Sequence, residues 1–458
     1  MMELRGVASC RAAFAVCLLI SLRSALAADQ RLGVPVAGSI TDTARQAVAL
    51  SSDTTDQTRL DVSASVGETD NIARMDGGPS QTVGVIGVDF GLKRTGRRFD
   101  TDLKGDFNYI DYLQSYYGSE VTGRFDGAAG WEIVPERLRW SVEDSFGQAQ
   151  LQPFSAVTPD NLENVNVVST GPDLLLRPTQ SLFVKLGGRY AYAHYETNPF
   201  DNRRLMGNFA LGHDLSGHSS IALNGDFQSI RFTNTIVNSD YDRRNFYASY
   251  LARGSRTDLS VDAGVSQSND GGSWRTTPFV RIEATRVVST ASVLKVIASR
   301  QYSDASDSFR SLQAGATGRI VVAPVSGTTS TYLDEYGTVL WSFERSRTMI
   351  DLSGTYERNT YATDHAQDVS RASVEARVAR RMTSTLTAEV SGRAARERFL
   401  ETDFHDRDYL ASVAVAYRAG RRLEFKLRYD HERRSVSAGT SGYTENRGLV
   451  TVSYQVKP

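Results

Sequence analysis

The side chains of this sequence that could do acid–base chemistry are six scattered histidines and the carboxylates beside some of them. The histidines are His194, His213, His218, His365, His405 and His431. His405 lies between Asp403 and Asp406, and His431 follows Asp430. A histidine held by a carboxylate is the general base of many hydrolases, so these positions would suit a protease or a lipase. The competing interpretation, which we adopt, is that they are solvated residues of loops and turns.

No sequence motif supports catalysis. The chain has no G-x-S-x-G, no phosphate-binding P-loop and no H-E-x-x-H. Asp403, Asp406 and Asp408 could bind calcium, but their spacing does not match an EF-hand loop. We therefore predict that the protein is not an enzyme, with no catalytic residues, no cofactor and no metal site.

The first residues have the pattern of a secretory signal peptide. Arg5 and Arg11 precede an apolar run over residues 12–22, and the small-residue segment Ala25-Leu26-Ala27 follows it. That run is too short for a membrane-spanning helix, and small residues at its end suit cleavage. We predict a signal peptide over residues 1–27. Both cysteines, Cys10 and Cys17, lie inside it, so the rest of the chain is expected to have no disulfide and no thiolate metal site.

Composition excludes two other classes of protein. The formal net charge is −1, which leaves no basic footprint for nucleic acid. Mean hydropathy is negative and there is no second long apolar run, so a helical inner-membrane protein is excluded.

The elements that must position any functional side chain are strands. In residues 409–430 the apolar Leu423, Phe425, Leu427 and Tyr429 alternate with Glu424, Lys426, Arg428 and Asp430. A strand sends successive side chains to opposite faces, so one face is apolar and the other charged. The same alternation recurs along the chain and predicts 18 to 20 strands. Their centres lie near residues 62, 85, 105, 125, 142, 168, 187, 208, 225, 246, 262, 280, 296, 339, 353, 373, 391, 413, 427 and 450.

The connections between these segments alternate between short and long. Short, often basic connections such as 93–97 and 418–421 alternate with longer ones such as 149–163 and 303–333. A propeller or a solenoid could also have a repeat of this length, but neither explains the alternation. Alternating strands with short periplasmic turns and longer outer loops are typical of a transmembrane β-barrel. We predict an all-β fold with one antiparallel barrel over residues 58–458, in the outer membrane of a Gram-negative bacterium and in contact with its lipids. The polar residues 28–57 are predicted to be a periplasmic arm.

The charged face of the strands is then the candidate functional surface, because it would point into the lumen. The candidate pore-lining residues are Lys104, Asp106, Arg189, Arg281, Glu283, Lys295, Glu389, Arg393, Glu424, Lys426 and Arg428. A mixed-sign wall of this kind hydrates a channel without strong ion selectivity. Cross-strand salt bridges inside a plugged barrel would give the same pattern, and the sequence leaves both open.

Several stretches resemble the outer-membrane β-barrel family associated with PEP-CTERM/exosortase and exopolysaccharide loci, a branch of the β-barrel porin 2 group. They are VSASVGETDNIAR (62–74), EIVPERLRWSVEDSFGQ (132–148), QPFSAVTPDNLENVN (152–166), ARVARRMTSTLTAEVSGRAARERF (376–399), HDRDYLASVAVAYRAGRRLEFKLRYDHERR (405–434) and YTEN (443–446). The resemblance implies a conduit that exports an exopolysaccharide or capsular polysaccharide, paired with a periplasmic polysaccharide export protein. A general diffusion porin for small solutes and a structural outer-membrane protein of the cell-surface assembly system are the alternatives.

Overall fold

The computed structural model describes residues 56–152, 155–315, 323–324, 330–402, 404–437 and 442–457, with side chains omitted over 311–329. The predicted signal peptide and nearly all of the predicted arm, residues 28–57, lie outside the described residues. The barrel begins at Gln57, one residue before the predicted boundary.

Twenty long strands form the wall, and each contains one of the twenty predicted centres. They are β1 (Gln57–Thr69), β2 (Gln81–Thr95), β3 (Phe99–Tyr112), β4 (Glu120–Val134), β5 (Leu138–Gln150), β6 (Leu162–Leu176), β7 (Leu182–Tyr195), β8 (Asn202–Ser216), β9 (Ser219–Phe232), β10 (Tyr241–Arg253), β11 (Thr257–Asn269), β12 (Trp274–Ser289), β13 (Ser292–Ser303), β15 (Tyr332–Arg345), β16 (Thr348–Tyr361), β17 (Val369–Arg381), β18 (Leu386–Phe399), β19 (His405–Ala419), β20 (Leu423–Val436) and β21 (Tyr443–Lys457). A two-residue strand, β14 (Ala323–Pro324), and the helix α3 (Ala305–Gly315) lie between β13 and β15.

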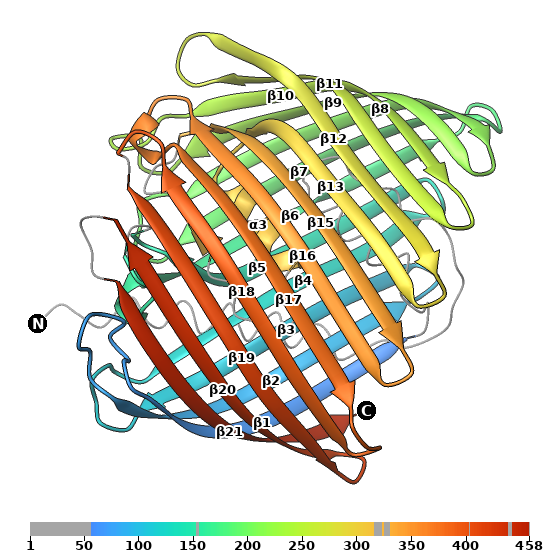
Figure 1. The fold of residues 1–458 in the computed structure, drawn as a ribbon. Helices are drawn as coiled ribbons and strands as arrows, with labels where there is room; N and C mark the ends of the chain where they lie inside the picture. Colours follow the sequence, from blue (N-terminus) through green and yellow to red (C-terminus); the bar gives the residue numbers. More distant parts are fainter. Residues whose placement is uncertain are drawn as a thin grey trace, which may run out of the picture.

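The wall closes on itself, as the sequence predicts. Each strand pairs antiparallel with its neighbours, and β1 pairs antiparallel with β21, with Val66 opposite Val450. The result is a barrel without an open edge (Figure 1). Twenty strands about 4.8 Å apart and tilted by about 40° give a backbone radius of about 20 Å.

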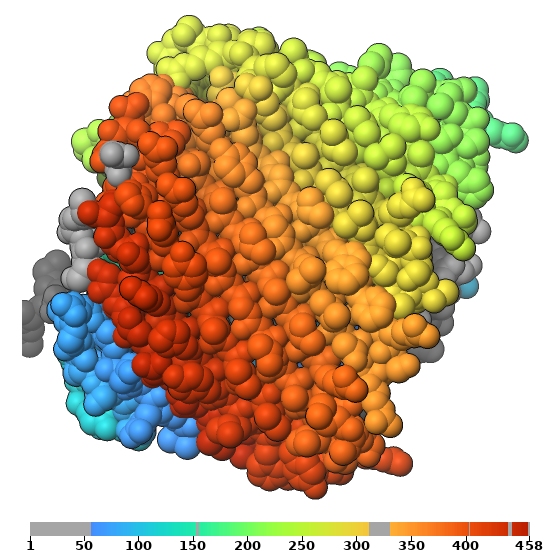
Figure 2. Space-filling view, viewed as in Figure 1, coloured from blue at the N-terminus to red at the C-terminus, as the bar shows by residue number. Residues whose placement is uncertain are grey.

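The two faces of the wall divide as the alternation predicts. Large apolar side chains are exposed on the outside, for example Leu427 at 60% and Val413 at 50%. The opposite face of the same strands carries the charged residues. Figure 2 shows the outside as a continuous surface over the strands from β16 to β20. An apolar exterior around a polar interior suits a wall that faces lipid. Among the described residues, no helix is long and apolar enough to cross a membrane.

Aromatic residues mark the borders of the apolar exterior. Trp131 and Trp140 face each other across β4 and β5, beside the short turn 135–137. Trp341 lies towards the same end of β15, and Trp274 begins β12 at the opposite end. These positions match the girdles that flank the apolar band of membrane barrels.

The connections confirm the predicted alternation. At the end of the barrel where the chain enters and leaves the wall, they have two to five residues, such as 217–218 and 346–347. Those at the other end, called here the loop end, include 70–80, 151–161 and the longest, 304–331. This last connection was expected to be an outer loop. Instead, its helix α3 lies inside the barrel (Figure 1), because its polar groups find partners on the inner wall.

Candidate functional site: the lumen and its inward-folded segment

The helix α3 starts at a carboxylate that serves both the helix and the wall. The side chain of Asp304 accepts hydrogen bonds from the backbone N–H groups of Ser306 and Asp307 at 3.0 and 3.1 Å. These groups have no partner inside the helix, so Asp304 is its N-cap. The hydroxyl of Tyr332, at the start of β15, donates to the backbone carbonyl of Asp304 at 3.1 Å.

Two arginines of the inner wall hold this end of α3. Arg204 of β8 contacts both carboxylate oxygens of Asp304, at 2.8 and 3.0 Å. Arg243 of β10 lies 2.9 Å from Asp304 and also pairs with Asp307. Arg310, one turn along the helix, contacts Asp307 at 2.8 Å. All but Arg310 are nearly inaccessible to solvent, so these arginines and aspartates form a buried ion cluster that fastens α3 to the wall.

Opposite charges keep the carboxylates of this cluster ionised. Burial alone would raise the pKa of Asp304, but Arg204 and Arg243 outweigh it and hold that pKa far below its usual range. Burial and the nearby Asp304 would raise the pKa of Asp307, yet the arginines again lower it. A buried pair that loses one partner costs about 3–5 kcal/mol, so the cluster keeps α3 in place at neutral pH.

An apolar contact fixes the helix further along the wall. Phe309 is fully buried and packs in a cluster with inward-facing side chains of β5, β6 and β7. The residues of this cluster are Ala149, Val165, Val167, Ala193, Tyr195, Phe200 and Phe309. The hydroxyls of Tyr195 and Ser306 are 2.9 Å apart. The inner wall is apolar here although it is polar elsewhere, so this stretch forms the surface against which α3 packs.

The helix narrows the lumen without filling it. Side chains of a sheet extend about 5 Å from the backbone, which leaves an inner radius of about 15 Å and a cross-section of about 700 Å². A helix of eleven residues is about 16 Å long and about 10 Å wide. It therefore covers at most about a quarter of the cross-section.

All eleven predicted pore-lining residues lie on the face opposite the exposed apolar side chains, but their surroundings differ. Arg189, Arg281 and Glu283 are buried. Arg189 pairs with Asp173, and Lys295 with Glu283 at 2.8 Å. Arg281 lies 3.7 Å from Asp262. These four belong to β7, β12 and β13, and they are engaged in the wall rather than free to contact a solute.

The other seven candidates lie on β3, β18 and β20, where the inner wall is more accessible. Pairs there include Lys104 with Asp102 at 3.5 Å, Glu389 with Arg377 at 2.8 Å, Arg428 with Asp430 at 2.8 Å and Glu424 with Arg418 at 3.8 Å. Asp106 accepts a hydrogen bond from Asn108. In the described part of the chain, Arg393 and Lys426 have no carboxylate within 4 Å. We call β17 to β21 with β1 to β3 the accessible half of the lumen. That its charges contact a transported solute stays a prediction.

A second cluster, which the sequence did not reveal, lies where the barrel closes at the loop end. Arg74, in the connection after β1, contacts Glu445 of β21 at 2.9 Å and Glu432 of β20 at 3.1 Å. It also donates to the backbone carbonyl of Val157 at 2.9 Å. Asn71 donates to the carbonyl of Thr444 at 3.0 Å. Burial would lower the pKa of Arg74, but Glu432, Tyr443 and Glu445 raise it above its usual value, so the charge persists.

This cluster brings together distant stretches of the sequence. Its residues come from four of the stretches quoted above, 62–74, 152–166, 405–434 and 443–446. They meet at the seam between the first and last strands. These residues therefore have a structural role. They connect the loop after β1 to β21 and to the connection 151–161.

Two histidines lie beside carboxylates in the structure: the Nδ1 atom of His194 is 2.9 Å from Asp201, and that of His365 is 3.2 Å from Asp368. The two histidines singled out in the sequence are placed differently. His431 faces outward from β20 and lies 2.7 Å from Asn446, whereas Asp430 faces the lumen and pairs with Arg428. His405 and Asp406 likewise point to opposite faces of β19, and Asp403 lies outside the described residues. Within the described ranges, no group of three or more His, Cys, Asp or Glu side chains could hold a metal ion.

A closed wall of twenty antiparallel strands, apolar outside and charged inside, defines a porin-like transmembrane β-barrel. Residues 326–456 match the family model "Putative beta-barrel porin 2". The match bears out the resemblance at the level of the family. The association with PEP-CTERM/exosortase loci stays an expectation. No curated protein matches the sequence.

Solved structures of other large barrels are similar to the chain at low identity. A mutant ferric enterobactin receptor from Pseudomonas aeruginosa, in complex with enterobactin, is 9% identical, with a TM-score of 0.48 over 88% of this chain and 82% of that one. The FrpB iron transporter from Neisseria meningitidis is 9% identical, at 0.44 over 90% and 84%. OccK2 from Pseudomonas aeruginosa, in complex with glucuronate, is 10% identical, at 0.38 over 88% and 99%. The strand register of this chain defines its fold independently of these likenesses.

Proposed function

We propose that the protein is an outer-membrane porin of a Gram-negative bacterium whose lumen conducts an exopolysaccharide or capsular polysaccharide to the cell surface. The observation that supports this proposal best is the accessible half of the lumen, which is lined by charges of both signs. The barrel is wide, and α3 is seated on the opposite half. Among the described residues, a path lined by polar groups therefore remains along β17 to β21 and β1 to β3.

Paired charges suit the passage of a hydrated polymer. Arg377 and Glu389 neutralise each other, as do Arg428 and Asp430. The pair of Arg377 with Glu389 is partly exposed on both sides and contributes only about 0–1 kcal/mol. In the other pair Asp430 is buried, but Arg428 is partly exposed. Such groups offer the hydroxyls of a polysaccharide many weak contacts rather than one strong site. A chain that moves through a pore must leave each site as easily as it enters, so weak and repeated contacts favour conduction.

The topology that we propose places the N-terminal arm on the periplasmic side. The short turns would lie in the periplasm and the longer loops outside, as in other outer-membrane barrels. Both ends of the wall then face the periplasm. The N-terminal arm, residues 28–57, would therefore be available there to a periplasmic polysaccharide export protein.

A general diffusion porin for small solutes is the second candidate, and α3 is the observation that favours it. A segment that folds inward and narrows the lumen limits the size of the solutes that pass. A structural protein of the cell-surface assembly system is the third candidate. It would need neither the paired polar lining nor the inward-folded helix.

Deletion of the gene separates these candidates. For export, surface polysaccharide falls and the polymer accumulates in the periplasm, while uptake of small solutes is unchanged. Complementation with the wild-type gene restores surface polysaccharide. Unchanged surface polysaccharide with reduced solute uptake would reject export in favour of the general porin. Unchanged transport of both kinds, with a disordered cell surface, would favour the structural role.

A further inference from the structure

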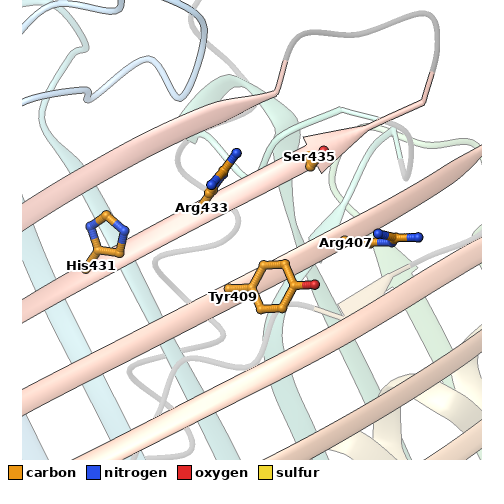
Figure 3. Close-up of a pocket in the computed structure, with 5 residues that line it drawn as sticks. All are labelled: Arg407, Tyr409, His431, Arg433 and Ser435. Carbon is orange, nitrogen blue, oxygen red and sulfur yellow. The ribbon is translucent and has the colours of Figure 1, made fainter.

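The outer face of β19 and β20 has a shallow hollow of about 360 Å³ near the loop end. Figure 3 shows that β19 contributes two of its lining residues and β20 the other three. They are Arg407, Tyr409, His431, Arg433 and Ser435. The proposed role of the lumen does not use this hollow, because it lies on the outside of the wall.

The hollow lies at the border of the apolar exterior that is nearer to the loop end. Along β19 the outward side chains are Val413 and Tyr409, which are 50% and 49% exposed, and then Arg407. Along β20 the exposed Tyr429 is followed on the same face by His431 and then Arg433. Aromatic residues mark the level at which acyl chains give way to headgroups. The arginines therefore lie at headgroup level, on the side of the loops.

The positive charge in this place is concentrated, and no carboxylate of the described residues compensates it. Arg396 of β18 lies directly opposite Arg407, and Arg433 is the diagonal neighbour of Arg407. Like charges directly opposite each other destabilise a strand pair. Within the described ranges, none of these three arginines has a carboxylate within 4 Å.

The acidic residues of the same strands cannot neutralise this patch, because they belong to the other face. Asp406, Asp408 and Glu432 alternate with the outward residues and point into the lumen. There Asp406 pairs with Arg434 at 2.6 Å, and Glu432 with Arg74. The alternation of a strand keeps the two sets apart.

Another pair of facing arginines on the outer wall is neutralised by carboxylates of this chain. Arg203 of β8 and Arg231 of β9 also lie directly opposite each other on the outer face. Asp242 of β10 contacts Arg231 at 2.9 Å, and Asp240 lies 3.8 Å from it. No such carboxylate accompanies Arg396, Arg407 and Arg433 among the described residues. Their repulsion would be relieved by an anion from outside the chain.

We propose that Arg396, Arg407 and Arg433 form a binding site for the phosphorylated headgroup of a lipid in the membrane leaflet at the loop end. The guanidinium fork matches the oxygens of a phosphate, and several arginines together bind it more strongly than neutral donors do. A membrane lipid is the occupant because the hollow lies on the outer face of the wall, where lipid-facing Tyr409 lines it and lipid-facing Tyr429 is close by. The proposal does not depend on what passes through the lumen.

Native mass spectrometry of the purified full-length protein tests the site. The probes are nanodiscs of phosphatidylcholine with a minor fraction of a bis-phosphorylated glycolipid such as lipid A, or of its dephosphorylated form. The wild-type protein should retain the phosphorylated lipid preferentially. Arg407→Gln with Arg433→Gln should lose at least about tenfold in affinity, because two charge-assisted contacts are removed. Arg203→Gln with Arg231→Gln removes the same charge elsewhere and should bind as the wild type does.

Folding is checked by the shift in electrophoretic mobility on heating. Removing like charges should not impair folding of the barrel. The single variant Arg433→Gln replaces the double variant in the binding test if the double variant does not fold. Equal retention of both lipids, or unchanged binding by R407Q/R433Q, would overturn the proposal. Displacement of the lipid by low inorganic phosphate would show a site for the free ion, and binding of a soluble acidic protein without lipid would show a protein site. Either result also rejects the lipid headgroup as the occupant.

Discussion

Removing the buried carboxylates that hold α3 should widen the lumen. The perturbation is Asp304→Asn together with Asp307→Asn. The two asparagines keep the shape of the side chains but leave Arg204 and Arg243 buried without a counter-charge. An uncompensated buried charge costs about 3–5 kcal/mol, whereas burial of Phe309 stabilises the seated helix by about 1.5–3 kcal/mol. The loss therefore exceeds what the apolar contact can hold, and α3 should leave the wall.

The barrel itself should survive this change. Its twenty strands and their closed register do not depend on α3, and the two arginines become solvated once the helix moves away. Because α3 covers at most about a quarter of the cross-section, single-channel conductance in planar bilayers should rise by up to about 1.3-fold.

A cysteine reports directly on the position of the helix. Phe309→Cys places a thiol at a fully buried site, and the only native cysteines, Cys10 and Cys17, lie in the predicted signal peptide. A water-soluble thiol reagent should label this cysteine slowly in the anchored protein and rapidly in the D304N/D307N background. Glu389→Gln is the matched control, because it removes an inner-wall carboxylate from a half-exposed pair with Arg377 and should change neither readout.

Two results would refute this reasoning about the anchor. One is a correctly folded D304N/D307N protein whose conductance and thiol labelling equal those of the wild type. The other is an equal rise in conductance in the Glu389→Gln control, which would mean that any loss of inner negative charge alters conduction and that the position of α3 is not involved.

Other perturbations test the anchor, the seam and the topology. Because the pKa of Asp304 is lowered, its contribution is complete above the ordinary carboxylate pKa and is lost only as pH falls through the lowered value. Labelling of Phe309→Cys should therefore stay slower than in the D304N/D307N background, compared at the same pH, from neutral pH down to about 4. Arg74→Ala deprives the buried Glu445 and the partly buried Glu432 of their closest cation and should lower the temperature at which heating changes electrophoretic mobility; an unchanged temperature would show that the cluster does not stabilise the seam. Gly67→Val should impair barrel closure, because even a Cβ there would lie 2.3 Å from the carbonyl oxygen of Gly448, and normal yield of folded protein would contradict this close approach. An epitope tag near Asp160 should be reachable on intact cells and one near Gly420 should not, and the reverse labelling would invert the proposed topology.

The path of the longest connection could not be predicted from the sequence. The ion pairs that hold α3 join Arg204 of β8 and Arg243 of β10 to aspartates of the connection, and their partners lie 61 to 103 positions apart along the chain. A local signal for the helix did exist, because Asp304 followed three residues later by Asp307 resembles a helix start. Nothing local indicated that this start would pair with Arg204 and Arg243, so an outer loop was expected. The seam cluster was missed for the same reason, since Arg74 and Glu445 are at opposite ends of the barrel sequence.

By itself the sequence determined the wall of this protein. The period of two, as in Leu423 to Tyr429, is a local property that decides which face meets lipid, and the connection lengths order the hairpins. Strand number, closure and the inward direction of the charged residues followed from these patterns. Only the tertiary structure decided which charges are free to meet a solute, because that depends on partners brought together by closure. Arg189 and Arg428 have the same pattern in the sequence, yet one is buried against Asp173 and the other lies in the accessible half of the lumen.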